Sequence, residues 1–138
     1  MARVGSGKLG VRRTGEGNIV AAKVAIVILA DTETRADRAK VANALTTAYE
    51  FKEAEEEVTV VFTGAGTRWI AELSDPDHRL YRAFDLVKDK VAGACKACAV
   101  SFGVKDEVEA SGVPLLAEYR GHQSLRKLVA EGFQVITF

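Results

Sequence analysis

Two cysteines, Cys95 and Cys98, are the only thiols of this 138-residue chain, and two residues separate them. Thiols this close can share a disulfide, a metal ion or a persulfide sulfur. The segment before them favours a strand and the segment after them a helix, whose free N–H groups would stabilise a thiolate on Cys95. We therefore name Cys95 as a candidate nucleophile and Cys98 as a candidate resolving thiol. Two alternatives stay open: each cysteine can be a small apolar filler, and one helix face could carry both.

Two histidines, His78 and His122, could add metal ligands to this pair. A zinc site uses about four protein ligands when it is structural and three when it is catalytic. Neither histidine has the local spacing of a paired ligand, and a four-ligand site would require both to reach the cysteine loop. We therefore predict neither a metal site nor a cofactor, and expect each histidine to be a surface or hydrogen-bonding residue.

A glycine-containing turn at 63–67 and an acidic loop after residue 30 are weaker candidates for ligand binding. Backbone N–H groups of such a turn can bind an anion, although the turn also serves chain geometry alone. The carboxylate of Asp31 can act as an acid–base group, although capping of the next helix is its more ordinary role. The candidate ligand-binding residues are Thr63, Gly64, Gly66 and Asp31.

Continuous runs of aliphatic and β-branched residues predict strands at 23–30 and 57–62. Such runs are typical of parallel sheets, whose strands are buried on both faces. Residues 133–138 predict a closing strand, and 113–116 a short additional one. The segment 91–95, before the cysteines, has weak β-propensity.

Apolar residues at helical spacing separate these strands. Thr34 can cap a first helix, residues 80–91 mark a further one with an ambiguous end, and Ser124 can cap the last. This alternation predicts an α/β fold, a three-layer sandwich around a mostly parallel sheet. In such sheets, sites form at the carboxyl ends of the strands. The acidic loop, the glycine turn and the cysteines would then share one edge.

Composition narrows the class of protein. Hydrophobic residues make up 48% of the chain and charged residues 28%, which suits one globular domain. We place that domain at 22–138, after a glycine-rich flexible tail at 1–21. The tail holds four basic residues and one acidic residue. The remainder is therefore slightly acidic, so nucleic acid is an unfavourable partner. No apolar run approaches the roughly 20 residues of a membrane span, and without an export signal we expect a cytoplasmic protein.

The order of these features resembles the DsrE/DsrF-like family, which includes sulfur-relay subunits. The resemblance rests on the aliphatic first strand, on Val-Phe-Thr-Gly-Ala-Gly at 61–66, on Cys95 with Phe-Gly-Val at 102–104 behind it, and on the closing segment 128–138. It implies a small flavodoxin-like domain assembled as trimers or hexamers. It also implies that Cys95 stands where the sulfur-carrying members accept a persulfide sulfur, with donor and acceptor proteins as partners.

Three hypotheses about function follow. The first is a thiol-based sulfur carrier or transferase that holds a persulfide on Cys95. The second is a non-catalytic oligomeric module that binds a small anionic ligand along the same edge. The third is a dithiol–disulfide redox protein that uses both cysteines. The sequence alone leaves open whether the chain is an enzyme.

Overall fold

The computed structural model describes residues 11–14 and 17–138. Within the segment predicted as a flexible tail, Val11–Thr14 (β1) and Gly17–Val20 (β2) pair as a two-stranded antiparallel sheet. The rest of the predicted tail, residues 1–10 and 15–16, lies outside the described residues. No helix in the described part of the chain is long and apolar enough to span a membrane.

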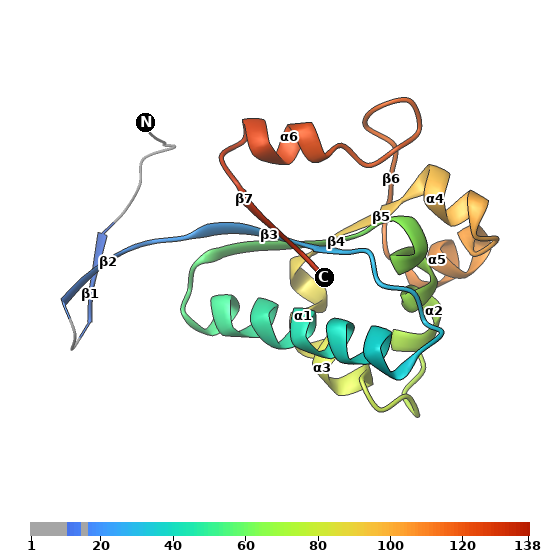
Figure 1. The fold of residues 1–138 in the computed structure, drawn as a ribbon, viewed down its shortest axis with the longest axis horizontal. Helices are drawn as coiled ribbons and strands as arrows, with labels where there is room; N and C mark the ends of the chain where they lie inside the picture. Colours follow the sequence, from blue (N-terminus) through green and yellow to red (C-terminus); the bar gives the residue numbers. More distant parts are fainter. Residues whose placement is uncertain (1–10, 15–16) are drawn as a thin grey trace.

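The main sheet has five strands, all parallel, in the order β6-β5-β4-β3-β7 (Figure 1). The predicted α/β class is therefore confirmed, as are the first, second and closing strands and the short additional one. The first predicted strand lies inside the sheet, because β3 pairs with β4 on one side and β7 on the other. The bounds of the five strands are Lys23–Ile28 (β3), Glu57–Phe62 (β4), Val91–Cys95 (β5), Leu115–Leu116 (β6) and Gln134–Thr137 (β7).

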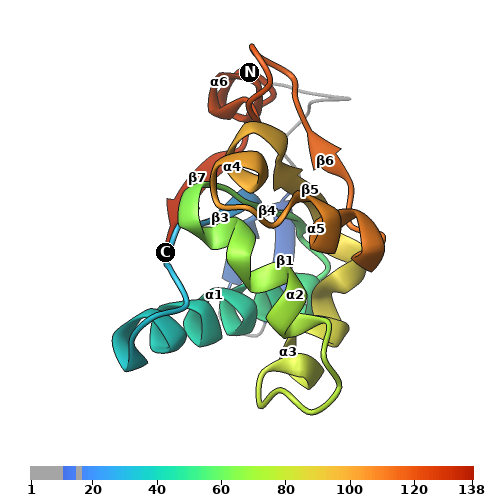
Figure 2. The ribbon, with the colours of Figure 1, turned by 90° about the vertical axis from the view of Figure 1, so that its right-hand side faces the viewer.

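Helices cover both faces of this sheet, as the three-layer prediction requires. Figures 1 and 2 show α6 on the opposite side of the sheet from α1 and α3. The α-helices are Arg35–Glu53 (α1), Trp69–Leu73 (α2), Tyr81–Val87 (α3), Lys96–Ser101 (α4), Lys105–Ser111 (α5) and Leu125–Ala130 (α6). Two 3₁₀ turns, Gly64–Arg68 (η1) and Lys88–Lys90 (η2), follow β4 and α3.

The caps of the first and last helices match the residues that predict them. The Thr34 hydroxyl accepts a hydrogen bond from the Asp37 N–H at 3.0 Å, and the Asp37 carboxylate accepts one from the Thr34 N–H at 3.2 Å. The Ser124 hydroxyl likewise accepts from the Lys127 N–H at 3.0 Å. Because each cap satisfies N–H groups that have no partner inside the helix, it fixes where the chain leaves the sheet edge.

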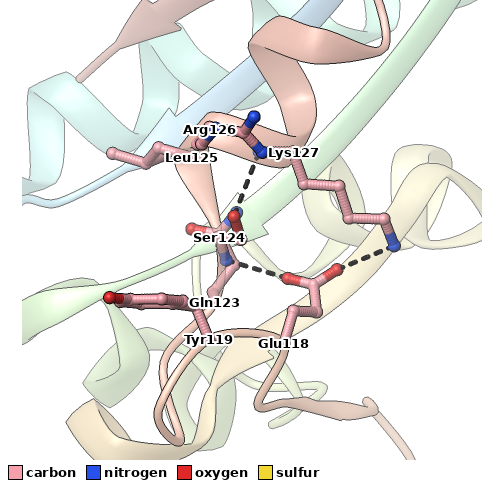
Figure 3. A pocket seen from close by; sticks show the side chains of 7 residues that line it. All are labelled: Glu118, Tyr119, Gln123, Ser124, Leu125, Arg126 and Lys127. Carbon is pink, nitrogen blue, oxygen red and sulfur yellow. Dashed lines mark hydrogen bonds and ion pairs between the residues drawn. The ribbon is translucent and has the colours of Figure 1, made fainter.

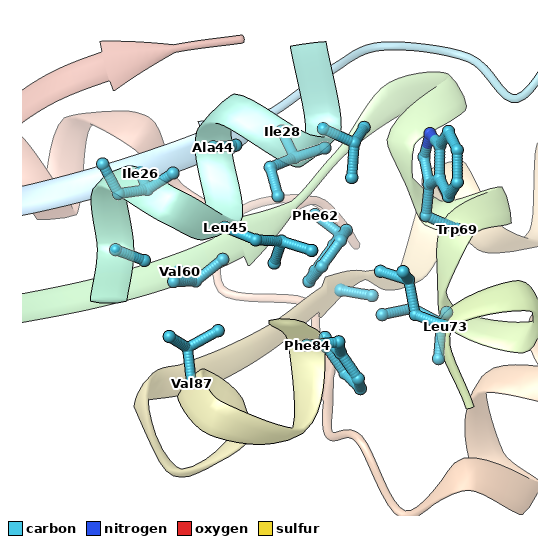
Figure 4. Packing of buried hydrophobic residues seen from close by; sticks show 14 of the residues in the cluster. Ile26, Ile28, Ala44, Leu45, Val60, Phe62, Trp69, Leu73, Phe84 and Val87 are labelled. Carbon is cyan, nitrogen blue, oxygen red and sulfur yellow. The ribbon is translucent and has the colours of Figure 1, made fainter. Parts of the chain in front are cut away.

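The two layers of core are unequal. The larger one packs alternate residues of β3 and β4 against α1, α2 and α3, with Trp69, Phe62 and Phe84 as its largest side chains (Figure 4). The smaller one, beneath α6, consists of Ala25, Val27, Val61 and Leu128 with three partly buried neighbours. The core beneath α6 is therefore small, and two apolar residues of α6 itself, Leu125 and Val129, remain exposed.

Candidate functional site

The two thiols lie at the carboxyl edge of the sheet, where the chain passes from strand to helix. Cys95 is the last residue of β5 and the N-cap residue of α4, and Cys98 lies in the first turn of that helix. The alternative in which one helix carries both cysteines is therefore wrong. The predicted helix at 80–91 ends at Val87, which leaves Val91 to begin β5.

A glycine in β5 brings the next strand close to the thiols. A Cβ atom on Gly93 would lie 2.5 Å from the Pro114 carbonyl oxygen and 2.7 Å from the Leu116 Cγ. Its φ of +156° is also a value that residues with a side chain rarely adopt. The bare backbone of Gly93 lets β6 pair with β5 through Ala94 and Cys95. The segment after β6 then begins directly beside the thiols.

That segment, residues 117–124, is the β6–α6 loop, and it covers Cys95. Its Gly121 carbonyl accepts a hydrogen bond from the Ala97 N–H at 2.9 Å, which ties the loop to α4. The Gln123 N–H donates to the Cys95 Sγ at 3.5 Å, and the His122 Nδ1 lies 3.6 Å from the same sulfur. These contacts leave the Cys95 side chain fully buried.

The surroundings of Cys95 favour its thiolate. Burial is the largest single effect and raises the pKa of Cys95. Hydrogen bonding from the Cys98 thiol, from the Gln123 and Cys98 amides and from His122 outweighs it, so that the pKa falls from 9.0 to about 7. Burial and the adjacent Cys95 instead raise the pKa of Cys98. The surroundings therefore favour the thiolate of Cys95 over that of Cys98, and the thiolate is the nucleophilic form of a cysteine.

The two thiols differ in burial. Cys98 is half-buried, whereas Cys95 has no exposed surface. The physical reason is the β6–α6 loop, which lies over the start of α4 and leaves the next turn nearer to solvent. A reagent that reaches Cys95 must therefore displace part of this loop.

Two of the four predicted ligand-binding residues lie beside the thiols. The Thr63 hydroxyl is 3.7 Å from the Cys98 Sγ, and the Gly64 amide lowers the pKa of Cys98 against the dominant effect of burial. Gly66 instead packs on β3, since a Cβ there would lie 2.1 Å from the Ile28 carbonyl oxygen.

Asp31, the fourth of these residues, forms an ion pair. Its carboxylate is 2.8 Å from the Arg68 Nη1, and Arg68 also lies 2.9 Å from Glu33. The Asp31 carbonyl accepts a hydrogen bond from the Trp69 indole at 2.9 Å. These contacts join the loop after β3 to η1 and α2.

A pocket adjoins the thiol site on its α6 side. It has a volume of about 680 Å³, within the usual range of small-molecule sites. Figure 3 shows its wall, where Glu118 accepts from the Ser124 N–H at 2.8 Å and pairs with Lys127 at 3.2 Å. Gln123 lines this pocket and also contacts Cys95 through its N–H. Gln123 as a whole is only 7% exposed, and its Oε1 has no hydrogen-bond partner among the described residues.

Sequence reasoning missed Gln123 as a site residue, and it considered His122 as a ligand only to set it aside. His122 and Gln123 follow Cys95 by 27 and 28 positions and reach it through β6 and a loop, so no local spacing marks them. Cys95, Cys98 and His122 place one potential metal-ligand atom each within 4.8 Å of one another. His78 lies elsewhere, against the Trp69 ring and 3.4 Å from Glu72.

The fold and the site together describe a class of protein: a parallel α/β domain with a thiol at the carboxyl end of an inner strand. A sequence model of the DsrE/DsrF-like family matches residues 22–138, and the chain belongs to that family. It is 35% identical over 89 residues to the uncharacterised protein MJ0733 of Methanocaldococcus jannaschii, an alignment that covers 64% of this chain and 72% of the relative.

A solved structure supports the fold. The conserved protein of unknown function BT1422 from Bacteroides thetaiotaomicron superposes with a TM-score of 0.59 at 17% identity. The match covers 83% of this chain and 94% of that one.

Proposed function

We propose that this protein carries sulfane sulfur on Cys95. The observation that carries the proposal is the environment of Cys95, a buried thiol with a pKa of about 7 that contacts the Cys98 thiol, His122 and the Gln123 amide. At neutral pH about half of such a thiol is thiolate, which is the nucleophilic form. Membership of the DsrE/DsrF-like family supports the same conclusion.

The transfer takes place in two balanced steps. The Cys95 thiolate attacks the outer sulfur of a donor persulfide; a new S–S bond forms on Cys95, the old one breaks, and the donor leaves as a thiolate. An acceptor thiolate then attacks the outer sulfur of the Cys95 persulfide, and Cys95 leaves as a thiolate. Neither step needs an external oxidant. Hydrogen bonding from Gln123 and His122 stabilises the Cys95 thiolate before loading and after release.

The adjoining pocket is suited to one of the sulfur partners. It is large enough for a small persulfide or for the cysteine side chain of a protein donor, and Gln123 connects it with the sulfur of Cys95. We propose that the donor enters from this side as the β6–α6 loop moves. The amide oxygen of Gln123 would then accept a hydrogen bond from the incoming group.

A dithiol–disulfide couple is the second candidate, because the Cys98 thiol donates toward Cys95. Its chemistry is distinct: the Cys95 thiolate attacks a substrate disulfide, and Cys98 then displaces the substrate thiolate to close a Cys95–Cys98 disulfide. The protein is oxidised and the substrate disulfide reduced. Such a couple loses two hydrogens from the protein and gains no sulfur.

Intact mass after incubation with a small-molecule persulfide separates these functions. The carrier predicts a gain of one sulfur atom in the wild type and in Cys98→Ser, reversed by reduction, and no gain in Cys95→Ser. The redox couple predicts the mass of the disulfide instead. No change in the wild type under either persulfide or mild oxidant would refute both and leave the anion-binding module.

A further inference from the structure

We propose that Cys95, Cys98 and His122 form a zinc-binding site. The three side chains come from β5, α4 and the β6–α6 loop, and their potential ligand atoms lie within 4.8 Å of one another. This differs from the sequence-based prediction of no metal site. That prediction considered a four-ligand site, for which both histidines would have to reach the cysteines. One histidine suffices, because an open zinc site uses three protein ligands.

The distances fit a tetrahedral ion. With Zn–S of about 2.3 Å and Zn–N of about 2.05 Å, two tetrahedral ligands lie about 3.6 Å apart for a sulfur–nitrogen pair and about 3.8 Å for a sulfur–sulfur pair. The Cys95 Sγ and His122 Nδ1 are 3.6 Å apart. No pair of the three ligand atoms exceeds 4.8 Å, so the site closes around an ion with shifts of about 1 Å or less.

The ligand types select a soft or borderline cation. Two thiolates and one imidazole suit Zn²⁺, whereas Ca²⁺ and Mg²⁺ require oxygen ligands. Zn²⁺ binding releases the proton of each thiol that is still protonated, and the imidazole binds in its neutral form.

The three ligands differ in exposure, so an ion can enter from solvent and bind to a buried thiolate. His122 is exposed and Cys98 half-buried, while Cys95 lies beneath them without exposed surface. The described residues supply three ligands to this cluster, so a fourth position remains for water or an exogenous thiol.

Zinc and sulfur would compete for Cys95. A zinc-bound Cys95 sulfur has committed an electron pair to the metal and is a weaker nucleophile toward a persulfide. The bound ion also connects Cys98 and His122 above Cys95, which blocks the approach of a donor. Zinc occupancy would thus hold the protein in an unloaded state. This consequence depends on the proposed sulfur carriage, whereas the zinc site itself does not.

The test uses reduced full-length protein and metal alone. Competition with a chromophoric zinc chelator measures stoichiometry and affinity, and Co²⁺ substitution reports thiolate ligation through its charge-transfer absorption. We expect one ion per chain. His122→Ala and Cys98→Ser should each weaken binding at least tenfold, and the Co²⁺ charge-transfer band should lose intensity in Cys98→Ser.

His78→Asn is the matched control, because His78 contacts Glu72 and Trp69 rather than the thiols, and asparagine retains an acceptor for the Leu80 N–H. It should bind zinc like the wild type. Because His122 is exposed, His122→Ala should keep the fold, and far-ultraviolet circular dichroism checks that it does. Absence of zinc binding by the wild type, or equal affinity in His122→Ala, overturns the proposal. Sulfur loading is measured separately without metal, so either proposal can fail alone.

Discussion

Two variants at position 98, which have the same number of cysteines, test the hydrogen bond that the Cys98 thiol donates to Cys95. Cys98→Ser keeps an O–H donor at this position, and Cys98→Ala removes it. Both variants leave Cys95 as the only thiol, so any titrating thiolate belongs to it. The pair of variants therefore isolates one contact that lowers the pKa of Cys95.

The size of the effect follows from the hydrogen bond and the pKa. A hydrogen bond to a charged group contributes about 1.5–3 kcal/mol, and one pKa unit corresponds to about 1.4 kcal/mol. We expect the pKa of Cys95 to stay near 7 in Cys98→Ser and to rise by at least about one unit in Cys98→Ala. At pH 7 the thiolate fraction would fall from about one half to about one tenth or less.

Ultraviolet absorbance of the metal-free protein as a function of pH measures this thiolate directly. Persulfide loading at pH 7 should slow by about fivefold or more in Cys98→Ala relative to Cys98→Ser, in step with the thiolate fraction. Equal titration midpoints in the two variants would refute the hydrogen-bond account. A midpoint at or above 9.0 in Cys98→Ser would show that the protein does not activate Cys95 at all.

Three further predictions concern stability and assembly. The pKa of Cys95 is lower in the folded protein (about 7) than its ordinary value (9.0), so the unfolded chain binds more protons between these values. In urea unfolding, the free energy of unfolding of the wild type minus that of Cys95→Ser should increase by at most about 2.7 kcal/mol from pH 7 to pH 9, and this increase should disappear as the pH falls. A difference that does not change with pH would contradict this prediction. Gly66→Ala should lower the free energy of unfolding by about 3 kcal/mol or more, because its Cβ would lie 2.1 Å from the Ile28 carbonyl oxygen, a backbone atom that cannot move aside as a flexible side chain could. Unchanged urea unfolding would contradict that packing. Leu125 and Val129, two apolar residues of α6, are 45% and 63% exposed, so we expect the protein to self-associate. Val129→Glu should give a smaller mass in light scattering than the wild type, and a monomeric wild type at micromolar concentration would contradict this prediction.

The sequence predicts those parts of the fold that local pattern determines. The strand 23–28 is recognisable because every position from Val24 to Ile28 is buried, which requires an unbroken aliphatic run. The caps at Thr34 and Ser124 are recognisable because a hydroxyl three residues before an N–H has a defined partner. The strand 91–95 is less distinct, since its small residues serve close packing against β6 rather than β-propensity.

The site is predicted only in part, because it joins residues that local pattern does not connect. The sequence places Cys95 at the end of a strand, and the structure agrees. The contacts of His122 and Gln123 with Cys95 depend on the path of the loop after β6, which has no local signature. The same loop buries Cys95 more deeply than Cys98.

The pairing of β7 with β3 has a consequence for the synthesis of the chain. Val24 has Gln134 as its partner, so the inner strand β3 is completed by a segment that is made 110 residues later (134 − 24). During translation, β3 can pair with β4 soon after both emerge, but its other edge stays open until β7 follows. An open aliphatic edge is a template for other chains, and closure over a long loop is slow. We therefore expect substitutions in β7 to reduce the yield of folded protein, through aggregation of nascent chains, before they alter the chemistry of Cys95.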